Sequence, residues 1–336
     1  MAREIDITFG RRRPLEISLR RAKFGGPLRD PAWVSPKRLL ERGRRLLLMI
    51  HGFNVNLCEA GCAYDIFMRS LNLFWRARAV SLYWPGDAAM QPSHVTERVN
   101  IVSKTWSVLS YPSQIQRARK AAEILADAVS IAIRARRTGA RALEPLEIII
   151  VAHSLGCRLT LEFLKLMRPS TTQQIISFPL VILMAAAVPR YLVRRGEDLA
   201  KALDTPNKVL IYKSRADNVL LATFRSGQLL ERPFPMGWSL AARDAIGLGG
   251  CGPNISHKVR EIPGSRAHSE YWNDPGIASR LIEEIDGLRV AESLSRPLEL
   301  RQLSSGRTIL FRTIEGRKLN PRPPEQRGLR RVCGSC

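Results

Sequence analysis

The sequence predicts an α/β fold in which a mostly parallel central sheet is covered by helices on both faces. Between residues 44 and 286, short continuous apolar runs alternate with longer segments that have helical periodicity. Strands that are apolar throughout are typical of parallel sheets, because helices cover both sides of such a sheet. The composition agrees: 336 residues that are 45% hydrophobic and 25% charged supply enough apolar surface for a large core.

The elements follow from these two patterns in chain order. The apolar runs, which begin with Leu46 to Ile50 (LLLMI), predict strands at 46–50, 78–83, 146–151, 180–188, 209–213 and 258–262. The periodic segments predict helices at 57–73, 113–136, 155–167 and 275–286. The second helix rests on apolar residues spaced three or four apart, namely Ile115, Ala118, Ala122, Leu125, Val129 and Ala132.

Two long segments, 86–111 and 224–256, interrupt this alternation and are expected to be loops of the kind that form lids or binding sites. Residues 297–314 predict a β-hairpin that turns at Ser304-Ser305-Gly306. The chain beyond it is polar, basic and rich in proline, so we expect disorder there. The predicted organisation is therefore a basic N-terminal extension (1–43), one α/β domain (44–287), and a C-terminal hairpin with a basic tail (288–336).

The net charge of +23, from 53 basic and 30 acidic residues, is concentrated at the two ends of the chain. Residues 1–45 hold 13 Lys/Arg against 5 Asp/Glu, and residues 300–336 hold 9 against 2. Two interpretations stay open: solvated tails, or contacts with phosphate-rich partners. Nucleic acid is the less favoured partner, because the chain has no basic strand with interleaved aromatic residues and no recognition motif.

Neither membrane insertion nor secretion is expected. No run of 18 apolar residues is present, and acidic residues stand near the N-terminus where a signal peptide needs an apolar stretch. We therefore expect a cytoplasmic protein. Six cysteines are too few for a disulfide scaffold, and the single CxxC at Cys333 and Cys336 has no second ligand pair, so no metal site is predicted.

The first candidate for chemistry follows the strand LEIIIV, where the chain reads Ala152-His153-Ser154-Leu155-Gly156 before a predicted helix. A serine nucleophile must project from a sharp strand-to-helix turn, and small residues two positions before and after it relieve the crowding. Ala152 stands where the pattern G-x-S-x-G has its first glycine. Because strand, turn and helix all occur, we interpret Ser154 as a nucleophile rather than as an ordinary N-cap.

The second candidate follows the strand at 209–213. A serine nucleophile needs a base, and the base needs an acid that orients it and stabilises its charged form. Asp217 comes directly after this strand, at the edge of the sheet where the reactive loops of parallel strands gather. Asp204 is the competing acid, but it precedes the strand and is expected at the opposite edge. An alternative role for Asp217 is to cap the next short helix.

The base is expected to be His268, which lies beyond the last predicted strand. The chain has five histidines, and the other four are less suitable. His153 is expected to point away from the face of the nucleophile, while His51 begins a glycine turn. His94 lies in the early long loop and His257 precedes the last strand. An oxyanion hole would use the backbone N–H groups of Leu155 and Phe53, since Gly52 lets the chain turn sharply after the first strand.

The chain from about 44 to 286 resembles the α/β-hydrolase superfamily and, more narrowly, a bacterial branch of uncharacterised serine hydrolases similar to lipases and esterases. Five blocks carry the resemblance, all in the expected order: HGFN at 51–54, YWPG at 83–86, AHSLG at 152–156, SRADNVL at 214–220 and HSEYW at 268–272. The resemblance implies an α/β-hydrolase fold with Ser154 as nucleophile, His268 as base and Asp217 as orienting acid. It also implies oxyanion donors at Phe53 and Leu155.

The function expected from this site is that of a serine hydrolase cleaving an ester-type bond, such as a lipid or other acyl ester, through an acyl-enzyme. Neither a metal nor an organic cofactor is expected. Trp84, Phe234 and Trp238 are candidates for substrate contacts, although the apolar side chains of 224–256 could equally pack that loop onto the sheet. The alternative class is a hydrolase-fold protein with little or no activity that binds anionic membrane or nucleic acid through its basic ends. The oligomeric state stays open.

Overall fold

The computed structural model describes residues 15–19, 45–71, 75, 78–86, 101–137, 146–167, 176–231, 243–253, 255–295, 299–302 and 308–311. The chain forms two compact units, residues 1–279 and residues 280–336. The boundaries predicted from the sequence, at 43 and 287, stay predictions.

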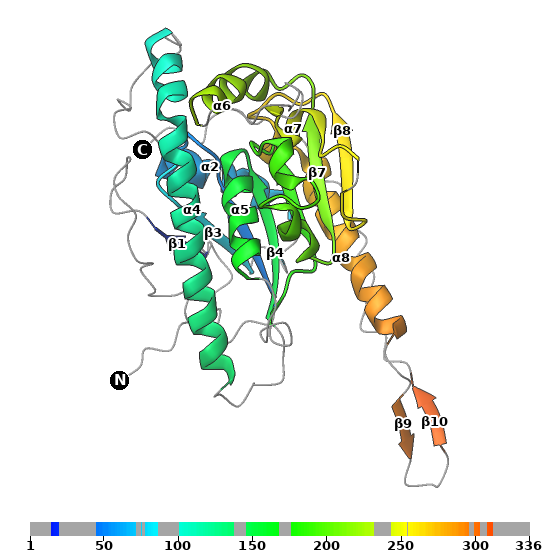
Figure 1. The fold of residues 1–336 in the computed structure, drawn as a ribbon. Coiled ribbons are helices and arrows are strands. Elements are labelled where there is room, and N and C mark those ends of the chain that lie inside the picture. The colour runs from blue at the N-terminus through cyan, green and yellow to red at the C-terminus, as the bar shows by residue number, and fades with distance from the viewer. Residues whose placement is uncertain are drawn as a thin grey trace, which may run out of the picture. The chain divides into compact units, whose positions relative to one another are not determined.

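One parallel sheet organises the first unit (Figure 1). Its strand order is β1-β3-β2-β4-β6-β7-β8, and the short β5 pairs with β4. Every pair in this sheet is parallel, as the apolar runs predict. The strands are β1 (Leu15–Ser18), β2 (Arg45–Ile50), β3 (Ala79–Tyr83), β4 (Leu146–His153), β5 (Ile176–Ser177), β6 (Val181–Met184), β7 (Val209–Ser214) and β8 (Val259–Gly264).

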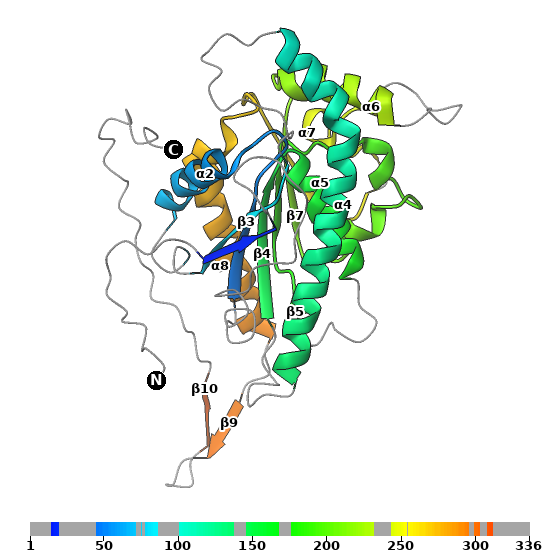
Figure 2. The same ribbon diagram turned by 90° about the vertical axis from the view of Figure 1, so that its left-hand side faces the viewer.

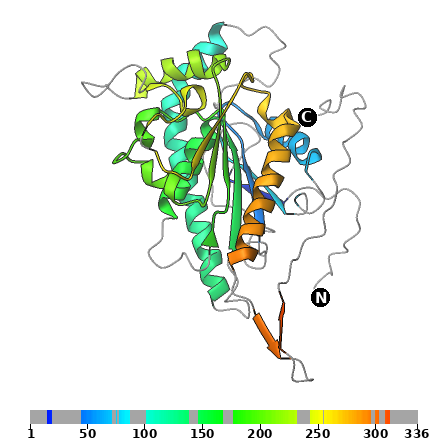
Figure 3. The same cartoon turned by 90° about the vertical axis from the view of Figure 1, so that its right-hand side faces the viewer.

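Helices cover both faces of this sheet. Helices α4 (Ile101–Arg137) and α5 (Leu155–Leu166) lie on one face, and α2 (Leu57–Arg69) lies on the other (Figure 2). Figure 3 shows the same layers from the opposite direction, with the teal α4 and the blue α2 on either side of the sheet. The shorter helices are α6 (Arg225–Glu231), α7 (Ile246–Gly249), a π-helix η3 (Val219–Phe224), and the 3₁₀ helices η1 (Arg190–Val193), η2 (Ala200–Asp204) and η5 (Tyr271–Asn273).

Burial explains why the central strands are apolar throughout. All five residues from Leu46 to Ile50 are buried, and so are Ile148 to His153 of β4 and the whole of β6. Because helices cover both faces, successive side chains enter apolar layers on opposite sides of the sheet. The carboxyl ends of β2, β4, β7 and β8 therefore lie along one edge, where the loops after each strand can meet.

The sheet begins earlier in the chain than the sequence predicts. Strand β1, within the predicted N-terminal extension, pairs with β3 over four residues, and Leu19 after it donates a backbone hydrogen bond to Tyr83. Ile17 and Leu19 are buried. The sequence does not predict this strand, because only two apolar residues of a short edge strand face the core, and that pattern is too weak to recognise.

The strand predicted at 180–188 is wrong in its second half. Strand β6 ends at Met184, and Ala185 has a φ of 45°, which turns the chain out of the sheet. The backbone groups beyond it bond elsewhere, since Ala187 donates to the carbonyl oxygen of Ser154. Apolar composition alone could not show this end, because Ala185 to Val188 remain buried outside the sheet.

Both predicted long loops contain helix. Helix α4 starts at Ile101 and continues through Pro112, where the sequence predicts its beginning. Tyr111 is buried there and packs edge-on against the rings of Phe53 and Phe224, so tertiary contacts offset the hydrogen bond that a proline removes. Within 224–256, α6 and α7 are helical. Gly227 of α6 lies so near Tyr111 that a Cβ would be 2.7 Å from its ring.

The second unit contains the antiparallel pair β9 (Glu299–Gln302) and β10 (Thr308–Phe311), which confirms the predicted hairpin strands. The predicted turn lies outside the described residues. Helix α8 (Pro275–Ser295) begins in the first unit and extends nine residues beyond its predicted end.

The proposed roles of the basic ends, and the CxxC, fall almost entirely on residues that lie outside the described ranges. Among the described helices, none combines the length and the apolar character needed to cross a bilayer.

Candidate active site

Ser154 occupies a strained turn between β4 and α5. Its φ and ψ are 53° and −124°, a conformation that residues with a side chain rarely adopt. Neighbouring backbone holds this turn in place: Ser154 N–H donates to the Met184 carbonyl at 2.9 Å, and its own carbonyl accepts from Ala187 at 3.1 Å. Strained residues persist only where the surroundings over-determine them, and such residues are concentrated at functional sites.

Close backbone contacts explain the small residues around this turn. A Cβ on Gly156 would lie 2.3 Å from the carbonyl oxygen of His51, and one on Gly52 would lie 2.6 Å from the Cβ of Ser154. The start of α5 and the loop after β2 are therefore pressed against each other beside Ser154. Ala152, which replaces the first glycine of the pattern, is accommodated as a buried residue of β4.

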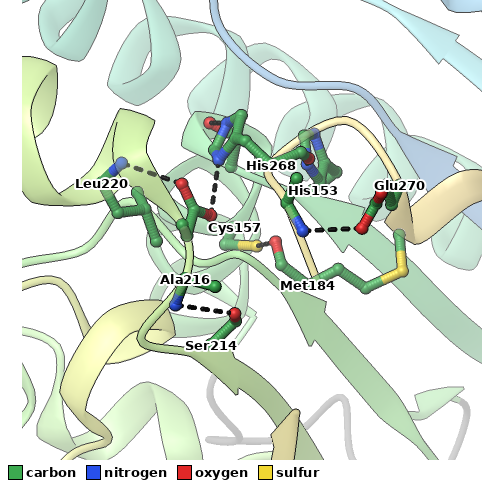
Figure 4. A network of polar contacts seen from close by, with 11 residues as sticks. His153, Cys157, Met184, Ser214, Ala216, Leu220, His268 and Glu270 are labelled. Carbon is green, nitrogen blue, oxygen red and sulfur yellow. Dashed lines mark hydrogen bonds and ion pairs between the residues drawn. The ribbon is translucent and has the colours of Figure 1, made fainter. Parts of the chain in front are cut away.

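The structure brings Ser154, His268 and Asp217 together in one chain of hydrogen bonds. His268 Nε2 lies 3.0 Å from Ser154 Oγ, and His268 Nδ1 lies 2.8 Å from Asp217 Oδ2 (Figure 4). A carboxylate can only accept, so the ring proton lies on Nδ1 and Nε2 is left to accept the serine hydroxyl proton. The three residues follow β4, β7 and β8 at the same edge of the sheet.

The carboxylate of Asp217 is fully buried, and both of its oxygens have partners. While Oδ2 faces His268, Oδ1 accepts from the backbone N–H of Leu220 at 3.0 Å, in the π-helix η3 (Figure 4). A buried carboxylate is retained only where hydrogen bonds replace its lost hydration. The geometry thus fits both predicted roles, since one oxygen caps the turn and the other faces the imidazole of His268.

Asp204, the competing acid, is placed elsewhere. It is the last residue of η2, before β7, and its carbonyl oxygen accepts from Lys258 Nζ at 2.6 Å. The loop order of a parallel sheet separates the two aspartates, since residues before and after a strand lie at opposite edges.

The loop after β2 reaches Ser154, as the predicted oxyanion hole requires. Gly52 lies against Ser154, and the following turn is fixed by Asn54, whose φ is 59° and whose N–H donates to the Gly86 carbonyl at 2.8 Å. Leu155 is the first residue of α5, where a backbone N–H has no acceptor within the helix. A capping box between Asn56 and Glu59 then begins α2 and anchors the end of this loop.

A family model described as "Alpha/beta hydrolase of unknown function (DUF900)" matches residues 31–232, more than half of the sequence. The chain belongs to this family of α/β hydrolases. No curated protein matches it significantly.

Three solved structures are similar to this α/β hydrolase over most of its length. MenH from S. aureus has 12% identity and a TM-score of 0.33, with 73% of this chain and 95% of that chain covered. The pyrethroid hydrolase PytH has 15% identity and a TM-score of 0.31, covering 72% and 97%. Esterase B from Lactobacillus rhamnosis has 12% identity and a TM-score of 0.32, covering 76% and 78%.

His153 of the α/β hydrolase is placed differently from what the sequence predicts, and His51 makes a contact that the sequence does not show. His153 does not point away from the site, because its Nε2 lies 2.8 Å from the carbonyl oxygen of His268 and the two rings are 4.8 Å apart. His51 is buried, and its ring stacks on Trp84 at 5.7 Å. The sequence could not show either contact, because both partners come from other loops.

The candidate substrate contacts are only partly described. Trp84 is fully buried, and its Nε1–H donates a hydrogen bond to the His51 carbonyl oxygen at 2.9 Å. It therefore packs beneath the backbone of the loop after β2 and is shielded from solvent. This packing argues against a role for Trp84 in contacting substrate. Phe234 and Trp238 lie outside the described residues, whereas Phe224 is buried against Tyr111.

Two further residues at the site, Leu220 and Met184, could not be identified from the sequence. They bond to Asp217 and Ser154 through backbone groups, which have no sequence pattern.

Ser154 is the residue suited to attack in this site. The nearby Cys157 is buried and its thiol lies 3.3 Å from the carbonyl oxygen of Ala152, and burial raises the pKa of this thiol well above its ordinary value. Because the thiolate is the reactive form, Cys157 is unsuited to attack. Within the described ranges, no group of three or more His, Cys, Asp or Glu side chains gathers as metal ligands would.

Proposed function

We propose that this α/β hydrolase is a serine hydrolase in which Ser154, His268 and Asp217 form a catalytic triad. One observation carries the proposal: the hydrogen bonds run in order from Ser154 Oγ through both nitrogens of His268 to a buried carboxylate. The strained conformation of Ser154 at the strand-to-helix turn supports it, because such a turn projects a serine side chain beyond the end of its strand.

The proposed reaction proceeds through an acyl-enzyme. Ser154 Oγ attacks the ester carbonyl carbon while its proton moves to His268 Nε2, and Asp217 stabilises the resulting imidazolium. The backbone N–H groups of Phe53 and Leu155 would bind the oxyanion. Collapse of this intermediate expels the alcohol, which takes the proton from His268. Water then attacks the acyl carbon with His268 as base, and the acid and free Ser154 are released.

Apolar surface near the triad favours an ester with an apolar acyl group. Val219 and Leu221, which follow Asp217 in the π-helix, are 43% and 40% exposed, an unusual exposure for large aliphatic side chains. Phe53 beside the proposed oxyanion hole is half-buried. These side chains would let an acyl chain leave water when it binds.

A fluorophosphonate probe together with a series of p-nitrophenyl esters tests this proposal. We expect wild-type protein to be labelled and to hydrolyse the esters, and Ser154→Ala to do neither. Ser226→Ala is the matched control, since Ser226 is an exposed serine of α6 whose hydroxyl donates to the Ala222 carbonyl. Absence of labelling in the wild type, or equal labelling of wild type and Ser154→Ala, would refute the proposal.

A further inference from the structure

His153 joins the nucleophile turn to the loop that carries His268. It is the last residue of β4 and directly precedes Ser154, but its ring lies among residues of the loop after β8. Its Nε2 is 2.8 Å from the carbonyl oxygen of His268, which lies beside it in Figure 4. Its ring centroid lies 5.9 Å and 6.2 Å from those of Tyr271 and Trp272.

This histidine is held as a neutral donor. A carbonyl oxygen can only accept, so the ring proton of His153 lies on Nε2. Burial, together with the neighbouring His268 ring, lowers the pKa of His153 to about 3. His153 therefore adds no positive charge beside His268 at neutral pH. On its other side, Nδ1 would lie 3.2 Å from a Cβ on Gly52, so the ring also contacts the loop after β2.

The loop that carries His268 needs such an anchor. Most residues from Pro263 to Glu270 are exposed, and His268 itself is only half-buried. Apart from the side-chain bonds of His268 to Asp217 and Ser154, the loop's polar contacts include an ion pair between Arg266 and Asp274 and a bond from the Ala267 N–H to Glu270. Neither of these two reaches β4. The bond from His153 is made to the backbone of His268 itself, and it comes from the residue adjacent to Ser154.

We propose that His153 is a positioning residue: its Nε2–H holds the main chain of His268 so that the imidazole stays within hydrogen-bond distance of Ser154 Oγ. This inference rests on the proposed triad. His153 is almost fully buried and donates to a backbone carbonyl, so it need not touch substrate. Its loss should lower kcat and leave KM nearly unchanged, because displacement of a reacting group by about 1 Å can slow catalysis about 100-fold.

Three replacements of His153 test this role. They differ in whether the new side chain can donate a hydrogen bond to the His268 carbonyl oxygen from the position of Nε2. His153→Gln places an amide N–H near that position, His153→Asn has a donor that is too short to reach, and His153→Leu has none. With p-nitrophenyl ester as substrate, we expect His153→Gln to retain most of kcat. We expect His153→Asn and His153→Leu each to lose about 10- to 100-fold at similar KM. Thermal unfolding identifies any variant that does not fold, and the Gln–Asn comparison suffices if His153→Leu fails.

His257→Leu is the matched control, because His257 is an exposed loop histidine and its loss should leave kcat unchanged. The inference is overturned if folded His153→Gln is no faster than His153→Asn, or if all three variants match wild type. In either case Ser154→Ala remains inactive if the proposed triad is correct. If Ser154→Ala itself hydrolyses the ester at the wild-type rate, the proposed function fails instead.

Discussion

At the scale of single residues, the side chain of His268 is hydrogen-bonded to both Ser154 and Asp217. This double contact predicts how substitutions in the triad should change activity. Ser154→Ala and His268→Ala should each lower kcat/KM for ester hydrolysis by several orders of magnitude, and the double variant should lose little more. The two residues act as one catalytic unit, so once one of them is replaced, replacing the other lowers the rate little further. Steady-state kinetics on the three variants measures this. Losses that multiply would show that Ser154 and His268 act independently.

The two aspartates offer a direct test of the acid. Asp217→Asn should lower kcat strongly, because an amide beside Nδ1 favours the tautomer whose Nε2 carries the proton and cannot accept from Ser154. Asp204→Asn is the matched control and should be close to wild type, since Asp204 lies before β7. The kinetics of both variants at neutral pH decide the assignment. The reverse result, an inactive Asp204→Asn with active Asp217→Asn, contradicts it.

The buried His153 should also affect stability as the pH changes. Its pKa is about 3 in the folded protein and about 6.5 in an unfolded chain, so between these values the unfolded state binds a proton that the folded state does not. Stability from this group is present above pH 6.5 and is lost as the pH falls. Between pH 6.5 and 5, wild type should lose about 2 kcal/mol more than His153→Gln. Urea unfolding of both proteins at the two pH values measures the difference, and parallel losses would contradict it.

At the scale of elements, the turn at Ser154 depends on close backbone contact between the start of α5 and the loop after β2. Gly156→Ala should lower the free energy of unfolding by about 1–3 kcal/mol, because its Cβ would meet the carbonyl of His51 at 2.3 Å and the backbone must shift. Activity should fall with it, since the same shift moves Ser154. Chemical denaturation and ester kinetics of the purified variant test both effects.

Gly61 in α2 supplies the control for that substitution. A Cβ at Gly61 would meet only the Tyr83 hydroxyl, at an ordinary 3.6 Å. Gly61→Ala should therefore stabilise the protein by about 1 kcal/mol, because alanine favours a helix over glycine. If Gly156→Ala and Gly61→Ala are equally stable and active, the contact at Gly156 has no energetic importance.

At the scale of the whole molecule, the prediction concerns binding of the basic C-terminal residues 300–336 to an anionic membrane. Each Lys or Arg near an anionic bilayer contributes about 1 kcal/mol, and residues 300–336 hold nine of them. We predict salt-sensitive cosedimentation with anionic but not neutral vesicles, reduced in a version that ends at Ser295. That end point keeps α8 whole. If both versions stay in the supernatant at low salt, the stretch is solvated charge only.

The sequence by itself determined the central strands of the sheet and the order of the candidate site residues along the chain. Continuous apolar runs such as LLLMI predict buried parallel strands, because only a strand covered on both faces needs no polar side. Ser154 and Asp217 could be found because each follows such a strand, and His268 because it follows the last predicted strand; parallel strands end at one edge. Local residue type also indicated the turn at Ser154, since Gly156 relieves its crowding.

Only the tertiary structure decided which neighbours complete the site. The contact of His153 with the His268 carbonyl and the bond from Trp84 to the His51 carbonyl both join segments far apart in the chain. The same holds for the end of β6 at Met184 and for the helix that continues through Pro112. Such features depend on backbone groups and packing partners from other elements, and local sequence patterns carry no information about those partners.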